Sequence, residues 1–125
     1  MQYLLMIYGN EAVRPNPADL EAMSNDYAIF TRQIVQSGNF KGGERLHPTT
    51  SATTVRVRDG KPVMTDGPFA ETREQLAGYY VIEAANLDAA TAIAARIPGA
   101  LTGSIEVRPI VQIQQEELQK FGRAS

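Results

Sequence analysis

Cysteine is absent from this 125-residue sequence, and histidine occurs once, as His47. Without cysteine the chain has no disulfide bond, no zinc–thiolate site and no cysteine nucleophile. A metal site would have to combine His47 with carboxylates such as Glu44, Asp66 or Glu71, and no ligand spacing points to one. A phosphate-binding loop and the sequence context of a serine nucleophile are missing as well. We therefore expect neither a metal nor a cofactor.

Excess charge and long apolar runs are also missing. The formal net charge is −2 and the pI is about 5.4, so no overall field attracts the chain to nucleic acid. Arg56, Arg58 and Lys61 form a small basic cluster around one expected hairpin, which is typical of a solvated face. The longest apolar run, residues 3–8, is too short to span a bilayer, and the first residues lack the basic segment of a signal peptide. These absences predict a cytoplasmic protein with no nucleic-acid or membrane partner.

The residues that are present predict one domain over residues 1–111, followed by a Gln- and Glu-rich tail over residues 112–125. A hydrophobic fraction of 43% in a chain of this length is enough to build a core. Residues 2–8 are apolar on both alternating faces, which is typical of a strand that is covered on both sides. This first strand therefore belongs in the middle of the fold.

A long helix is predicted to follow. Asn16 is a good N-cap, Pro17 suits the first helical position, and Asp19 lies near the positive end of the helix dipole. Apolar residues then recur at spacings of three and four from Leu20 to Ile34, which predicts a helix of about five turns that buries one stripe.

The rest of the chain alternates between strands and one shorter helix. Five further stretches have strand-like patterns: residues 39–46, 53–58, 62–65, 78–84 and 104–111. The Asp-Gly pair at 59–60 predicts a tight hairpin between the second and third of them. Asn86 is expected to cap the shorter helix, and the Pro-Gly pair at 98–99 to end it. Pro109 places the last strand at an edge, because proline cannot donate to a central ladder.

Without the hairpin, the element order is βαββαβ. This order predicts an α+β, ferredoxin-like fold, in which two helices cover one face of an antiparallel sheet and the β-hairpin is an insertion. The opposite face of the sheet would be bare, although the first strand is apolar on both sides. An exposed apolar face predicts an interface, so we expect a homodimer that packs sheet against sheet.

Residues 65–74 combine a strongly determined turn with four ionisable side chains. Gly67 permits a positive φ, Pro68 fixes its own φ, and the carboxylate of Asp66 can accept a hydrogen bond from a nearby backbone N–H. Such a turn would hold the carboxylates of Asp66 and Glu71 in place. The turn also leaves open a plain structural role for Asp66, in which it bonds only its own backbone.

Five residues near this turn are candidates for a functional site. His47 is the candidate general acid or base, and Asp66 is the carboxylate that would orient it. Arg45 can bind a carboxylate through two parallel hydrogen bonds, Phe69 can form the wall of an apolar pocket, and Glu71 completes the set. We predict that the segments carrying them emerge at the same end of the sheet.

The Asp-Gly-Pro-Phe run at residues 66–69 and the residues that follow it resemble the signature of the DGPF branch of YCII-related proteins. The Glu-Arg-Leu-His-Pro segment at 44–48 is similar to that branch as well. The resemblance implies a dimeric α/β-barrel fold and a functional link to an extracytoplasmic-function sigma factor. In the wider superfamily it implies a catalytic His on the first helix and an Asp after the second. This chain has neither residue at those places, so that pair is not carried over.

Two functional hypotheses follow. The first is a ligand-binding or partner-binding regulatory module that uses a cleft near residues 66–69, with a small anionic ligand. The alternative is a cofactor-independent lyase or hydrolase, in which His47 and Asp66 form an acid–base pair that acts on a small anionic substrate. A closed pocket over paired side chains would favour the enzyme, and an open groove would favour binding.

Overall fold

The computed structural model describes residues 1–113, 117, 119 and 120. Across residues 1–113, six strands, two α-helices and two short 3-10 helices follow in the order β1 (Gln2–Gly9), α1 (Pro17–Gln36), β2 (Phe40–Arg45), η1 (Thr49–Ser51), β3 (Thr53–Arg58), β4 (Lys61–Asp66), β5 (Gln75–Glu83), α2 (Leu87–Ala94), η2 (Pro98–Leu101) and β6 (Ser104–Pro109).

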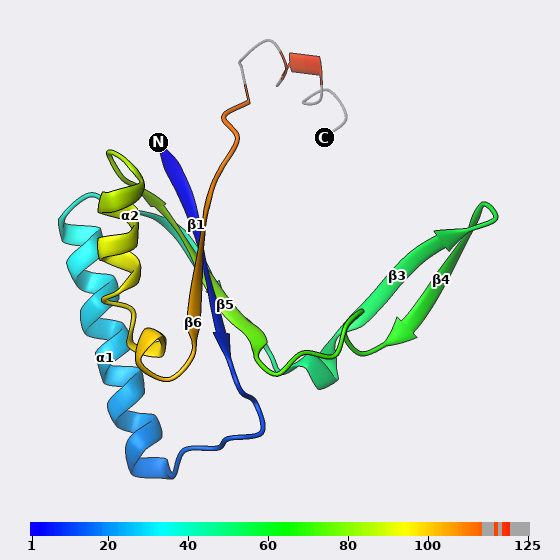
Figure 1. Cartoon of the computed structure of the whole chain (residues 1–125), viewed down its shortest axis with the longest axis horizontal. Coiled ribbons are helices and arrows are strands. Elements are labelled where there is room, and N and C mark those ends of the chain that lie inside the picture. Colours follow the sequence, from blue (N-terminus) through cyan, green and yellow to red (C-terminus); the bar gives the residue numbers. More distant parts are fainter. Residues whose placement is uncertain (114–116, 118, 121–125) are drawn as a thin grey trace.

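Four strands form one antiparallel sheet in the order β2–β5–β1–β6 (Figure 1). Strands that are joined through a helix are not neighbours in this sheet. β5 separates β1 from β2, and β1 separates β5 from β6. The predicted α+β fold with antiparallel sheets and two helices is confirmed, and the strand order is compatible with the ferredoxin-like pattern.

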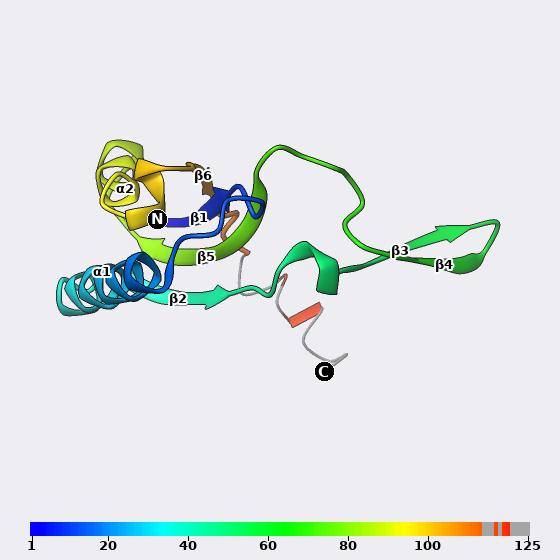
Figure 2. The same cartoon turned by 90° about the horizontal axis from the view of Figure 1, so that it is seen from below.

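The core lies between the sheet and the two helices, which cover the same face (Figures 1 and 2). Leu5 of β1 lies opposite Tyr80 of β5, and both side chains pack in this layer. The Tyr80 ring meets Phe30 of α1 edge-on, with 5.3 Å between the ring centroids. The buried hydrophobic residues of the core are Tyr3, Leu5, Phe30, Ile34, Ile82, Ala84, Ala90, Ile93, Ala94 and Ile97.

Helix α1 begins as its sequence predicts. The side-chain oxygen of Asn16 accepts a hydrogen bond from the Asp19 N–H at 2.8 Å, and Pro17 is the first helical residue. The apolar stripe is buried only in the second half of the helix, at Phe30 and Ile34. Leu20 is exposed, because the first turns of α1 extend past η2 (Figure 1). The part of α1 that packs on the sheet is therefore shorter than the apolar stripe in its sequence predicts.

Helix α2 is capped by Asn86, whose side-chain oxygen accepts a hydrogen bond from the Ala89 N–H at 2.9 Å. Buried alanines, Ala90 and Ala94, let its backbone approach the sheet closely. The prediction that Pro98 and Gly99 end this helix is wrong, since α2 stops at Ala94 and the Pro-Gly pair begins η2. Pro98 instead restricts the residue that precedes it, so that Ile97 has an extended backbone conformation.

Strands β3 and β4 form a two-stranded sheet of their own, the β3–β4 arm (residues 53–66). The predicted tight hairpin is confirmed, because Asp59 and Gly60 have φ values of 52° and 75°, as a type I′ turn requires. The arm projects far from the four-stranded sheet in both views (Figures 1 and 2).

The face of the sheet opposite α1 and α2 is apolar along its centre. Leu4 and Met6 of β1 lie opposite Val81 and Tyr79 of β5 on this face, and Tyr8 follows in the same column. We call these five residues the apolar sheet patch. Their side chains are half-buried, and α1 and α2 both lie on the other side of the sheet (Figure 2).

Strand β6 lies at the edge of the sheet, as Pro109 predicts. Most of the predicted tail lies outside the described residues, namely 114–116, 118 and 121–125. In the part of the chain that the structure describes, no helix is both long enough and apolar enough to cross a membrane.

Candidate functional site

Four strand ends meet at one end of the sheet. β1 finishes at Gly9 opposite the start of β5 at Gln75, and β6 begins at Ser104 opposite Tyr8. β2 finishes at Arg45, opposite Gly78 of β5. The loops that follow or precede these strands therefore gather at one edge, which we call the loop end.

Glu11 ties three of these loops together. Its carboxylate accepts hydrogen bonds from the Thr49 N–H at 2.9 Å and from Thr49 Oγ1 at 2.6 Å. Its own N–H donates to Gln75 Oε1 at 2.9 Å, and the Gln75 side-chain amide donates in turn to the Thr72 carbonyl at 2.6 Å. The segments after β1, after β2 and before β5 thus form one connected set. Sequence reasoning missed Glu11, because nothing in its polar loop indicates a partner 38 residues away.

The structure places all five predicted site residues on the surface. Arg45 is the last residue of β2, and His47 follows two positions later. Asp66 is the last residue of β4, and Phe69, 78% exposed, and Glu71 lie in the segment between β4 and β5. Within the described residues, none of these five side chains forms a hydrogen bond or an ion pair. The His47–Asp66 acid–base pair stays a prediction.

The two segments that carry these residues share one base. The Gly67 N–H donates to the Ala52 carbonyl at 2.7 Å, and Thr54 Oγ1 donates to the Gly67 carbonyl at 2.8 Å. Gly67 has a φ of 94°, so the positive φ predicted for this turn is confirmed. The base of the arm therefore joins the turn at residues 66–69 to the segment that leaves β2.

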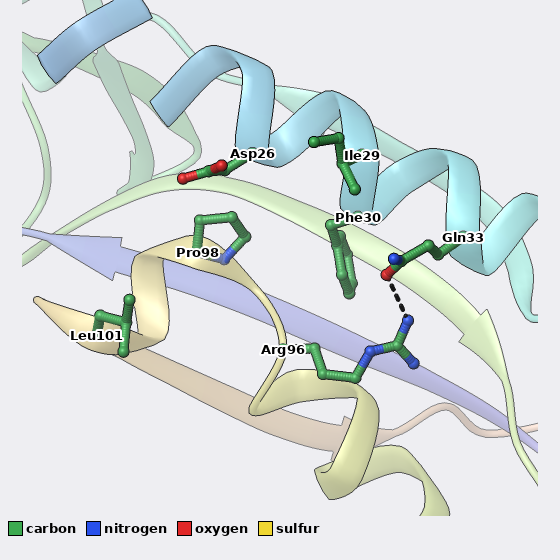
Figure 3. Close-up of a pocket in the computed structure, with 7 residues that line it drawn as sticks. All are labelled: Asp26, Ile29, Phe30, Gln33, Arg96, Pro98 and Leu101. Atoms are coloured by element: carbon green, nitrogen blue, oxygen red, sulfur yellow. Dashed lines mark hydrogen bonds between the residues drawn. The ribbon is translucent and has the colours of Figure 1, made fainter. Parts of the chain in front are cut away.

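A second candidate is an open hollow of about 240 Å³ on the helical side, between α1 and η2 (Figure 3). Its lining residues are Asp26, Ile29, Phe30, Gln33, Arg96, Pro98 and Leu101. Arg96 Nη2 donates to Gln33 Oε1 at 2.9 Å, and the guanidinium carbon lies 5.7 Å from the centre of the Phe30 ring. Asp26 lies at the opposite end of the hollow (Figure 3). None of the five predicted site residues lines it.

The charged groups of Arg96 and Asp26 give this hollow a positive and a negative end over an apolar floor. Such a lining suits a weakly held amphipathic molecule, but Leu101 is 90% exposed and the hollow is shallow. Among the described residues, no group of three or more His, Asp or Glu side chains is placed to hold a metal ion.

The fold and the loop end together define a class, namely a small α+β domain with two helices on one face of an antiparallel sheet and an extended hairpin arm. The family model of the YCII-related domain matches residues 1–114. The chain is also 38% identical over 122 residues to an uncharacterised protein of Rhizobium meliloti (strain 1021), a match that covers 94% of this chain and 98% of the relative. The chain belongs to the YCII-related family.

Proposed function

We propose that this chain is a homodimeric binding module of the DGPF branch of the YCII-related family. Its site is the loop end beside the turn at residues 66–69, and its ligand is a small anion or an anionic group of a partner. The observation that carries the proposal is the exposure of Arg45 and His47 next to loops that Glu11 holds in place. A fixed frame with free cationic or imidazole donors is suited to anion binding.

The homodimer is supported by the apolar sheet patch. An apolar centre with polar margins is what an isologous contact between two ferredoxin-like sheets needs. On the same face of β6, Arg108 donates to Glu106 at 2.6 Å, so the charges at this margin are already paired. A dimer formed through this face would leave the helices and the loop end accessible.

Binding is favoured over turnover by the surroundings of His47 and Asp66. General acid–base catalysis uses a side chain whose orientation and pKa are set by a partner held next to it. Both side chains are exposed, and in the described part of the chain no hydrogen bond joins them. The lyase or hydrolase alternative would require the two to meet when a substrate binds.

A regulatory role, with a functional link to an extracytoplasmic-function sigma factor, rests on the resemblance of residues 66–69 to the DGPF signature. The cytoplasmic location expected from the sequence likewise stays a prediction.

Amide NMR titration with benzoate and with citrate tests the binding site. We expect both anions to perturb the signals of His47 and Phe69 together, and Arg45→Gln to weaken the effect at least fivefold. Arg96→Gln, which changes the cation of the hollow, is the matched control and should leave the titration unchanged. Perturbations confined to Phe30 and Arg96 would move the site to the hollow and contradict the proposal.

The same spectra separate binding from acid–base chemistry. If His47 and Asp66 form a pair when an anion binds, Asp66→Asn changes the anion-induced perturbation of the His47 signals, because it removes the carboxylate that would orient the imidazole. We expect that perturbation to be the same in both proteins. A clear difference would favour the enzyme alternative.

A further inference from the structure

The β3–β4 arm has one apolar and one basic face. In its register Val55 lies opposite Met64 and Val57 opposite Pro62, and directly opposed residues share a face. The alternate pairs, Arg56 with Val63 and Arg58 with Lys61, lie on the other face. The arm is therefore patterned like a strand pair in which one side is buried.

Among the described residues, no segment covers this apolar face. Val55, Val57 and Met64 are 58%, 62% and 69% exposed. Both views show the arm standing clear of the sheet and the helices (Figures 1 and 2). A lone two-stranded hairpin is only marginally stable in water, so this pattern needs a surface to pack on.

We infer that the arm packs its apolar face, formed by Val55, Val57, Pro62 and Met64, against a second copy of this chain. The inference rests on the proposed homodimer and adds a second contact to it, in which the arm of each copy packs against the body of the other. We call this reciprocal contact the exchange of arms. The contact is separate from the apolar sheet patch, so substitutions can affect one without the other.

Surface area is the first reason to choose a second copy. A stable interface of standard size buries about 800 Å² of each partner. The apolar sheet patch is already half-buried within its own sheet, and its five side chains can add only about 400 Å² per copy. The four apolar side chains of the arm offer roughly the same area again. The sheet patch and the arm together reach the size that the patch alone does not.

Charge and length also fit a second copy. The arm carries three cationic side chains and two carboxylates, whereas the rest of the chain carries nine and twelve, so the arm of one copy is attracted to the body of the other. Six residues per strand give the arm a length of about 20 Å, and a four-stranded sheet is about 14 Å wide. The arm is long enough to reach across a partner's sheet. A nucleic acid bound to the basic face would leave the apolar face exposed.

Amide hydrogen–deuterium exchange of the full chain, measured at high and low protein concentration, tests whether the arm contacts a second copy. Light scattering gives the mass of the species at each concentration. We expect a dimer at high concentration in which the arm amides exchange at least tenfold more slowly than in the diluted monomer. Val57→Ser on the apolar face should abolish that slowing. Val63→Ser, which changes a valine on the basic face of the same arm, should retain it. Slow exchange in β1 and β5 checks that each variant is folded.

The outcomes distinguish the exchange of arms from the dimer itself. A dimer whose arm amides exchange equally fast at both concentrations would refute the arm contact while the proposed dimer stands. A monomer at all concentrations would overturn both. Equal loss of protection in Val57→Ser and Val63→Ser would also overturn the inference, because it would show that the effect is not specific to one face.

Discussion

Replacing Gly67 by alanine tests the backbone at the base of the arm without changing its packing. Gly67 has a φ of 94°, in the left-handed region that side chains disfavour. A Cβ added there meets no atom within 4 Å, so the substitution introduces no steric clash. Any loss of stability therefore reports the strain of the backbone alone.

The expected cost is the difference between two effects. A residue other than glycine held at positive φ costs about 1–3 kcal/mol. Alanine also restricts the unfolded chain, which offsets about 0.4–1 kcal/mol of that cost. We expect Gly67→Ala to destabilise this segment by about 1–2 kcal/mol, and Gly67→Val by somewhat more because valine is branched at Cβ.

The assay has to read the arm as well as the whole chain. The Gly67 N–H closes the base of the arm through its bond to the Ala52 carbonyl, so strain at Gly67 opens the arm before it unfolds the sheet. We expect the arm amides to exchange about tenfold faster, which corresponds to about 1.4 kcal/mol. Urea unfolding of the sheet should change less.

Gly9→Ala is the matched control. A Cβ at Gly9 also meets nothing within 4 Å, and Gly9 is not among the residues with positive φ. Its effect should stay within about 0.5 kcal/mol. If Gly67→Ala leaves the arm amides exchanging at the wild-type rate, the turn does not depend on glycine and the reasoning fails.

Two further substitutions test close contacts in the body. Gly103→Ala should destabilise the fold by several kcal/mol in urea unfolding, because the added Cβ would lie 2.0 Å from the Tyr8 carbonyl oxygen, and a cost under 1 kcal/mol would contradict this packing. Tyr27→Phe should cost about 1 kcal/mol at neutral pH, because the Tyr27 hydroxyl accepts a hydrogen bond from the Gly99 N–H at 3.1 Å. Burial raises the pKa of Tyr27, so the folding stability that its hydroxyl contributes is fully present below about pH 10 and is lost as the pH rises through the folded-state pKa. The urea unfolding free energies of wild type and Tyr27→Phe should therefore converge at high pH.

Short-range signals predicted the elements of this fold well. Asn16 and Asn86 each bond a backbone N–H three residues on, and the turn at 59–60 joins strands that are adjacent in sequence. Each of these devices is complete within a few residues, so the sequence contains all that is needed to recognise it. The end of α2, which was predicted wrongly, also depends on neighbouring residues, since Pro98 restricts the backbone of Ile97.

Which face of a strand is buried could not be predicted for β1. Leu4 and Leu5 are adjacent and identical, and residues 2–8 are apolar on both faces. Leu5 is fully buried against the helices, whereas Leu4 lies in the apolar sheet patch. The choice depends on which side the helices occupy, and that is a property of the chain as a whole. Leu4, and not Leu5, is consequently the position at which a charge would probe the proposed dimer.

The candidate site shows the same limit more strongly. The predicted residues lie in segments that do share a base, because the hairpin between them returns to its starting point. The residue that fixes the loops, Glu11, bonds Thr49 and Gln75 from far along the chain. A single carboxylate in a polar loop has many potential partners, and only the folded topology selects among them.

The turn at residues 66–69 links the two proposals. Asp66 ends strand β4 of the arm, and Phe69 lies in the segment that leads into the loop end. The hydrogen bond from the Gly67 N–H to the Ala52 carbonyl fixes this segment to the base of the arm. If a second copy immobilises the arm, it also immobilises the backbone beside Asp66, so the proposed anion site is more ordered in the dimer than in the monomer. Gly67→Ala, which loosens that bond, should then weaken anion binding at the loop end even though Gly67 offers no side chain to the ligand.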